Sequence, residues 1–186
     1  LRSLGRFVPR STPVFLVLVA WEGAVQVLHT LAPRAFCGRR SLDGAEKERP
    51  AVRLYSRLAY PYWFQHGILR VLWTLLREVN LAERFPPCPE LAQAYANHGV
   101  AMTVPGFFDR GVAYARRGLE MRRELHDLWG EGQSQAFLGI VLYAAARVRE
   151  AEAAGREAVR LLERTGDRWE YHTASYHVGL SLLRQG

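Results

Sequence analysis

The sequence DLWGEGQSQAFLG, residues 127–139, is matched forty residues later by DRWEYHTASYHVG, residues 167–179. Both segments have Asp first, Trp third and Gly last. A duplicated active site would share only its reactive residues, whereas a repeated structural unit also shares positions without chemistry. The terminal glycine is such a position, and it favours a structural repeat.

A small residue recurs at the same interval along most of the chain, at Ala59, Gly99, Gly139 and Gly179. A large apolar residue follows each of them three positions later: Tyr62, Met102, Leu142 and Leu182. Small residues let helices approach closely, and a fixed period of roughly 20 to 50 residues is typical of stacked helical repeats. Chance recurrence in a chain rich in Ala and Gly is the alternative.

The pattern of apolar residues and breaks predicts long helices joined by short turns. Prolines at 86, 87 and 89 and the VPG segment at 104–106 interrupt the pattern, because proline does not fit a helix interior. Pro61 falls inside the first predicted helix and should kink it. The expected helices cover residues 51–65, 68–84, 90–103, 107–125, 129–145, 148–165 and 168–185.

Each of the two matching segments begins with an aspartate at the start of a predicted helix. A carboxylate there accepts hydrogen bonds from free backbone N–H groups, so Asp127 and Asp167 are expected to be N-caps. Trp129 and Trp169 would then lie in the first turn and pack against the neighbouring repeat. The two aspartates and the two tryptophans are therefore interpreted as structural residues.

Residues 1–33 form an apolar or amphipathic helical segment, and residues 34–50 form a charged linker. The uninterrupted apolar run at 14–21 is too short to cross a bilayer. Glu22, Gln26 and His29 then interrupt it. We expect a buried helix here and no transmembrane span.

The net charge of +7 is concentrated in the first third of the chain. Residues 1–60 contain ten basic and four acidic side chains, whereas the rest is nearly neutral. Such an asymmetry indicates either a docking surface for a neighbouring domain or a contact with nucleic acid or membrane.

The sequence contains no arrangement typical of an enzyme or a metal site. Cys37 and Cys88 form no C-x-x-C motif, so we expect reduced thiols in a cytoplasmic protein. His172 and His177 are five residues apart and would diverge on one helix. A phosphate-binding P-loop is also missing. We therefore predict no catalytic residue, no cofactor and no bound metal.

The segment AFLGIVLYAAARVREAEAAGREAVRLL, residues 136–162, resembles the tetratricopeptide repeat. Gly139, Leu142, Ala151 and Ala158 stand at the defining small and large positions. The resemblance covers residues 51–186, about three and a half units, with a period of forty instead of the usual ~34. It implies an all-α fold, a right-handed superhelical array of antiparallel helix pairs.

Four further segments look like the helical repeat region of large bacterial signalling ATPases: LHTLAPRAFCGRR, RLYSRLAYPYWFQ, NLAERFPPCPELAQAYANHG and LLERTGDRWE. In that family an AAA-like or STAND-type module precedes the repeats, and a kinase, phosphatase or adenylate/guanylate cyclase domain lies elsewhere in the chain. The resemblance implies a regulatory piece of a longer protein that binds proteins or peptides and flanking domains.

Positions that line the partner groove in the tetratricopeptide family correspond here to Gln93, Asn97, Gln133, Phe137, Tyr143 and His177. Their amide, hydroxyl and imidazole groups would hydrogen-bond an extended peptide, unless the next repeat buries them. The leading hypothesis is a non-catalytic scaffold. The alternative is a basic module that binds nucleic acid or an anionic membrane surface through residues Arg34 to Arg57, and steep salt dependence would reveal it.

Overall fold

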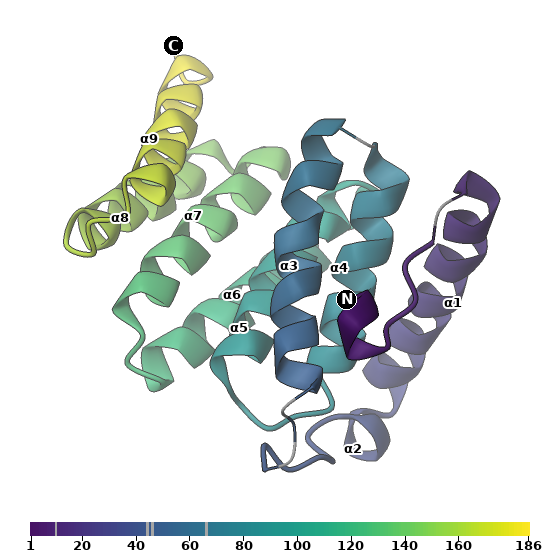
Figure 1. Ribbon diagram of the computed structural model, residues 1–186. Helices are drawn as coiled ribbons and strands as arrows, with labels where there is room; N and C mark the ends of the chain where they lie inside the picture. The colour runs from purple at the N-terminus through teal and green to yellow at the C-terminus, as the bar shows by residue number, and fades with distance from the viewer. Residues whose placement is uncertain (10, 44, 46, 66) are drawn as a thin grey trace. The chain divides into compact units, whose positions relative to one another are not determined.

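Every regular element in the described part of the chain is helical, and neighbouring helices pack antiparallel (Figure 1). The structure is a computed structural model that describes residues 1–9, 11–43, 45, 47–65 and 67–186. The helices are η1 (Arg2–Leu4), α1 (Thr12–Leu31), α2 (Pro33–Phe36), α3 (Glu48–Gln65), α4 (Ile68–Ala82), α5 (Pro89–Thr103), α6 (Phe108–Glu124), α7 (Leu128–Ala144), α8 (Val148–Glu163) and α9 (Arg168–Leu183). The all-α prediction is confirmed, and the seven predicted helices are α3 to α9 with small differences at their ends.

The chain divides into two compact units, residues Leu1–Ala94 and Tyr95–Gly186. In unit 1, α4 packs against both α3 and α1. Aromatic side chains join these three helices: Trp73 meets Phe15 edge-on at 5.4 Å between ring centroids and Tyr55 at 5.7 Å. Pro61 lies inside α3, where the sequence analysis placed it.

The segment after α2 is tied to the end of α4 by backbone hydrogen bonds. Gly38 N donates to Glu83 O at 2.8 Å, and Arg40 N donates to Arg84 O at 2.9 Å. Cys37 N also donates to Pro33 O at 2.8 Å and closes α2. Part of the predicted linker is therefore fixed against α4.

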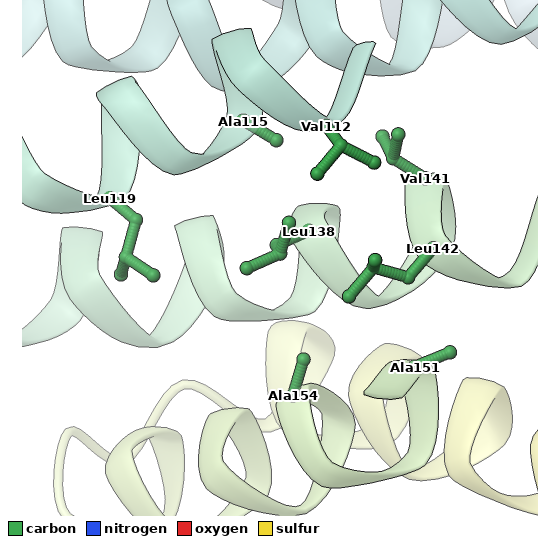
Figure 2. Close-up of a cluster of buried hydrophobic side chains, with 8 residues drawn as sticks. All are labelled: Val112, Ala115, Leu119, Leu138, Val141, Leu142, Ala151 and Ala154. Atoms are coloured by element: carbon green, nitrogen blue, oxygen red, sulfur yellow. The ribbon is translucent and has the colours of Figure 1, made fainter. Parts of the chain in front are cut away.

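In unit 2, α7 packs against α6, α8 and α9, and α8 packs against α9. Figure 2 shows a buried cluster in which side chains of α6, α7 and α8 interdigitate. Its members are Val112, Ala115, Leu119, Leu138, Val141, Leu142, Ala151 and Ala154. The large residues come mainly from α6 and α7, and the alanines of α8 let its backbone approach.

The small residues that recur every forty positions differ in how closely another helix approaches them. A Cβ added to Gly99 would lie 2.8 Å from Gly111 O, and one added to Gly139 would lie 3.3 Å from Ala151 O. At Gly179 an added Cβ would meet nothing within 4 Å. Ala59 is buried in unit 1. Close helix approach therefore occurs at Gly99 and Gly139 and is not needed at Gly179.

His98 in α5 is fully buried and meets Tyr114 edge-on, with ring centroids 4.6 Å apart. Neither ring nitrogen has a hydrogen-bond partner among the described residues. Burial, with a smaller contribution from the charge of Arg110, lowers the pKa of His98 to about 3. The imidazole is therefore neutral in the folded protein at neutral pH.

Acidification is expected to destabilise the protein through His98. The pKa is lower in the folded state than in the unfolded state, where it is about 6.5, so the unfolded state gains a proton first as the pH falls. Between pH 7.5 and 4.5 this difference removes about 2 to 3 kcal/mol of stability. Urea unfolding of wild type and His98→Phe at both pH values measures this loss of stability. If stability depends on pH equally in both proteins, His98 is not the cause of the acid destabilisation.

Candidate interaction surfaces

Three polar side chains on one face of α1 are buried. Glu22, Gln26 and His29 are 2%, 4% and 5% exposed. Their spacing of four and three residues places them on a single helix face. Phe15 continues this face toward the start of α1 and is fully buried.

The partners of this face lie on α4 and just after it. Arg77 donates to Glu22 Oε1 at 2.8 Å, and Asn80 Nδ2 donates to Glu22 Oε2 at 2.8 Å. His29 Nδ1 lies 2.7 Å from Glu83 Oε2. We call these five side chains the α1–α4 polar seam. It fixes the rotation of α1 about its own axis, because each contact requires the polar face to point at α4.

The charge of Glu22 is matched inside the seam. Burial alone would lower the pKa of Arg77, but Glu22 and Tyr55 raise it above its ordinary value. Asn80 Nδ2 also donates to the backbone oxygen of Glu22 at 2.9 Å. The carboxylate is therefore paired with a cation and held by hydrogen bonds, the condition under which burial of a charge is tolerated.

Because the polar face points inward, most of the large apolar side chains of α1 point outward. Seven large apolar residues of α1 are exposed, from Val14 at 38% to Leu31 at 76%: Val14, Leu16, Val17, Trp21, Val27, Leu28 and Leu31. We call them the α1 apolar face. The expectation that this helix is buried is wrong, since its buried residues are only Phe15, Glu22, Gln26 and His29. By length and composition alone, α1 is also sufficiently apolar to cross a membrane.

A cavity of about 340 Å³ lies near the C-terminal end of α1. Its lining combines apolar side chains with three arginines: Val25, Leu28, His29, Ala35, Phe36, Arg39, Arg40 and Arg84. Burial lowers the pKa of Arg84, and the charges of Arg40, Arg77 and Arg6 lower it further. The cavity therefore has an excess of positive charge, which favours anions.

Carboxylates neutralise part of the predicted basic region. Arg49 and Arg53 both donate to Glu90, at 3.1 Å and 2.8 Å. Burial alone would raise the pKa of Glu90, but hydrogen bonds from Arg53 and Arg49 hold it below its ordinary value. Arg40 pairs with Glu48 at 3.2 Å. Three exposed arginines form no ion pair with the described residues: Arg34, Arg39 and Arg57.

In unit 2 the two repeated aspartates are the N-caps that the sequence predicts. Asp127 Oδ1 accepts from Gly130 N at 2.9 Å, and Asp167 Oδ1 accepts from Glu170 N at 3.1 Å. Asp167 Oδ2 also accepts from Trp129 Nε1 at 2.9 Å. One residue therefore caps α9 and anchors the tryptophan of the preceding pair.

Trp129 and Trp169 occupy the same helix position but have different surroundings. Trp129 packs against the buried cluster of Ala136, Ala158, Leu162 and Ala174. Trp169 is 63% exposed. Only the first tryptophan packs against a neighbouring helix pair in the described structure.

Three of the residues predicted to line a groove contact other parts of the protein. Gln133 is buried and donates to Glu170 Oε1 at 2.7 Å. Phe137 packs against the same cluster as Trp129. The guanidinium of Arg184 lies 5.1 Å from the ring centre of Tyr143. Gln133 is therefore buried by the next helix pair, which is the alternative to a place in a peptide groove.

The other groove residues differ in burial and in the unit that contains them. Asn97 is buried in unit 2, and Gln93 is half-buried in unit 1. His177 is half-buried, and burial lowers its pKa. Its Nδ1 atom has no hydrogen-bond partner in the described residues. A peptide groove formed by the six residues stays a prediction.

No family model matches the sequence, and no curated protein matches it.

The sequence did not identify the α1 apolar face as a surface. A signal was nevertheless present, because Glu22, Gln26 and His29 recur at helical spacing inside an apolar segment. If a helix buries its polar face against another polar helix face, its apolar face must point elsewhere. The missing information was the matching set on α4, which lies more than fifty residues away along the chain.

Proposed function

We propose that the protein is a non-catalytic interaction scaffold of tetratricopeptide-like helix pairs, in the regulatory region of a bacterial signalling ATPase. The observation that carries the proposal is the α1 apolar face. A contiguous exposed apolar surface of this kind typically marks a site of protein or membrane contact. The partners are a protein or peptide and the flanking domains of the same chain.

Contacts between successive helix pairs of unit 2 support the tetratricopeptide-like part of the proposal. α7 touches both its own partner α8 and the following helix α9. Two side-chain bonds make that second contact, Trp129 to Asp167 and Gln133 to Glu170. They join residues 38 and 37 positions apart, close to the sequence period of forty. Repeat proteins are stabilised by such nearest-neighbour interfaces.

The test uses the complete reading frame that contains this sequence. We expect it to encode a nucleotide-binding module and to hydrolyse ATP at a rate that changes when Val17 and Leu28 are both replaced by Glu. Both side chains are exposed, so the substitutions should leave the helices folded. Leu183→Glu is the matched control, since Leu183 is exposed in α9. A reading frame without a nucleotide-binding module would contradict the proposal.

A second candidate is contact with an anionic membrane surface, favoured by the combination of the α1 apolar face with nearby arginines. Trp21 is 63% exposed on this face, and Arg34 and Arg39 follow the end of α1. Tryptophan and arginine beside an apolar helix face are typical of helices that lie in the membrane interface.

Vesicle binding tests this second candidate. If it is correct, wild type sediments with phosphatidylserine vesicles, and Val17→Glu with Leu28→Glu weakens binding by more than about tenfold, because each change removes an apolar side chain worth about 1.5 to 3 kcal/mol when buried. Leu183→Glu should bind like wild type. Equal recovery of all three proteins with the vesicles would reject a role for α1.

A further inference from the structure

We propose that His29, Cys37 and Glu83 bind a zinc ion. Each side chain offers one ligand atom, and the three atoms lie within 4.8 Å of one another. They come from the last turns of α1, the residue after α2 and the C-cap of α4. The inference concerns unit 1 alone and does not depend on the proposed function.

The ligand chemistry selects the metal. One imidazole nitrogen, one sulfur and one carboxylate oxygen form a set that suits Zn²⁺, whereas Mg²⁺ and Ca²⁺ prefer oxygen alone. The thiolate and carboxylate forms together would carry two negative charges and balance the ion. Three protein ligands leave a fourth tetrahedral position for water or another small ligand.

The required movement is small. Zinc bonds of about 2.0 to 2.3 Å place tetrahedral ligand atoms roughly 3.3 to 3.8 Å apart. No two ligand atoms of the cluster are more than 4.8 Å apart, so they must close by at most about 1 to 1.5 Å. The contact of 2.7 Å between His29 Nδ1 and Glu83 Oε2 must open by a similar amount or less as the ion replaces the proton between them.

The surrounding structure holds the ligands close to these positions. The side chains of His29 and Glu83 are 4% and 3% exposed. The His29 ring stacks on Phe36 with 5.4 Å between centroids. The backbone bond from Gly38 N to Glu83 O fixes the residue after Cys37 against the residue that supplies the carboxylate. Little conformational freedom is therefore lost when the ion binds, which favours affinity.

Nearby arginines oppose the binding of a cation. Arg39, Arg40 and Arg84 line the cavity that His29 also lines. The two anionic ligands that the ion requires would offset part of this repulsion. Cys37 is half-buried, so an ion has a route to the cluster from solvent.

The experiment titrates metal-free protein with Co²⁺, a spectroscopic substitute, and with Zn²⁺. We expect one ion per chain, a sulfur-to-cobalt charge-transfer band and a higher melting temperature with Zn²⁺. Cys37→Ser should abolish the band and weaken binding by more than about tenfold. Cys88→Ser is the matched control, because this second cysteine lies outside the cluster, and it should keep the band.

Glu83→Gln provides a second variant that keeps the side-chain shape and a hydrogen-bonding oxygen while removing the charge. We expect it to keep the cobalt–sulfur band at high Co²⁺ and to weaken binding by more than about tenfold. Absence of binding in wild type, or equal affinity in wild type and Cys37→Ser, would overturn the proposal. His29 and Glu83 would then form only a hydrogen bond between α1 and α4.

Discussion

Replacing Gly99 with alanine is expected to lower the free energy of unfolding by about 3 kcal/mol, near the upper end of the usual cost of overpacking. The new Cβ would lie 2.8 Å from Gly111 O and 3.0 Å from Ala115 Cβ. A backbone oxygen and a Cβ cannot rotate away as the end of a long side chain can. The helices must therefore separate, and the contacts around them are lost.

Gly179→Ala is the matched control for this prediction. Gly179 has the same place in the forty-residue pattern and also lies inside a helix, but an added Cβ would meet nothing within 4 Å. Alanine should therefore stabilise α9 by about 0.5 to 1 kcal/mol through its better helix propensity. Guanidinium unfolding of both variants gives the comparison. If Gly99→Ala proves as stable as Gly179→Ala, the close contact between Gly99 and Gly111 does not exist.

These glycines show what the sequence could and could not predict. Their common spacing indicated a repeated unit, and helix periodicity with proline breaks was sufficient to place α3 to α9. Spacing alone could not distinguish Gly99 from Gly179, because the distinction depends on whether another helix lies against the glycine. Trp129 and Trp169 differ for the same reason: among the described residues, only Trp129 has a neighbouring cap, Asp167, within hydrogen-bond distance.

The features of unit 1 were less predictable because they depend on residues far apart in the chain. His29, Cys37 and Glu83 follow no short metal-binding motif, and only the packing of α1 on α4 brings them together. A run of valine and leucine is usually buried, so α1 was expected in a core. The buried charge of Glu22, paired with Arg77, reverses that orientation.

Glu22→Ala is accordingly expected to destabilise unit 1 by about 3 kcal/mol. Removal of one partner from a buried ion pair costs about 3 to 5 kcal/mol, because the remaining charge loses its compensation. The lower value applies here, since the Arg77 side chain is 30% exposed and water can solvate it in part. Asn80 Nδ2 would also lose its bond to the carboxylate and keep only the bond to the backbone oxygen of residue 22.

The control removes a carboxylate from an ion pair at the surface. Glu157 pairs with Arg160 within α8, and their side chains are 34% and 59% exposed. Glu157→Ala should change stability little, because exposed pairs contribute weakly. Urea unfolding followed by tryptophan fluorescence checks both variants, and Trp73, one of the five tryptophans, packs against Phe15 of α1 and senses the loss of that contact.

The same variant also tests the orientation of α1. If the polar seam fixes the helix, Glu22→Ala should loosen α1 and make the segment that follows α2 more sensitive to limited proteolysis, whereas Glu157→Ala should leave the digestion pattern unchanged. Unaltered unfolding and digestion in Glu22→Ala would mean that the seam does not hold the helix. The outward direction of the α1 apolar face would then lose its physical basis, and with it the main support for a docking role.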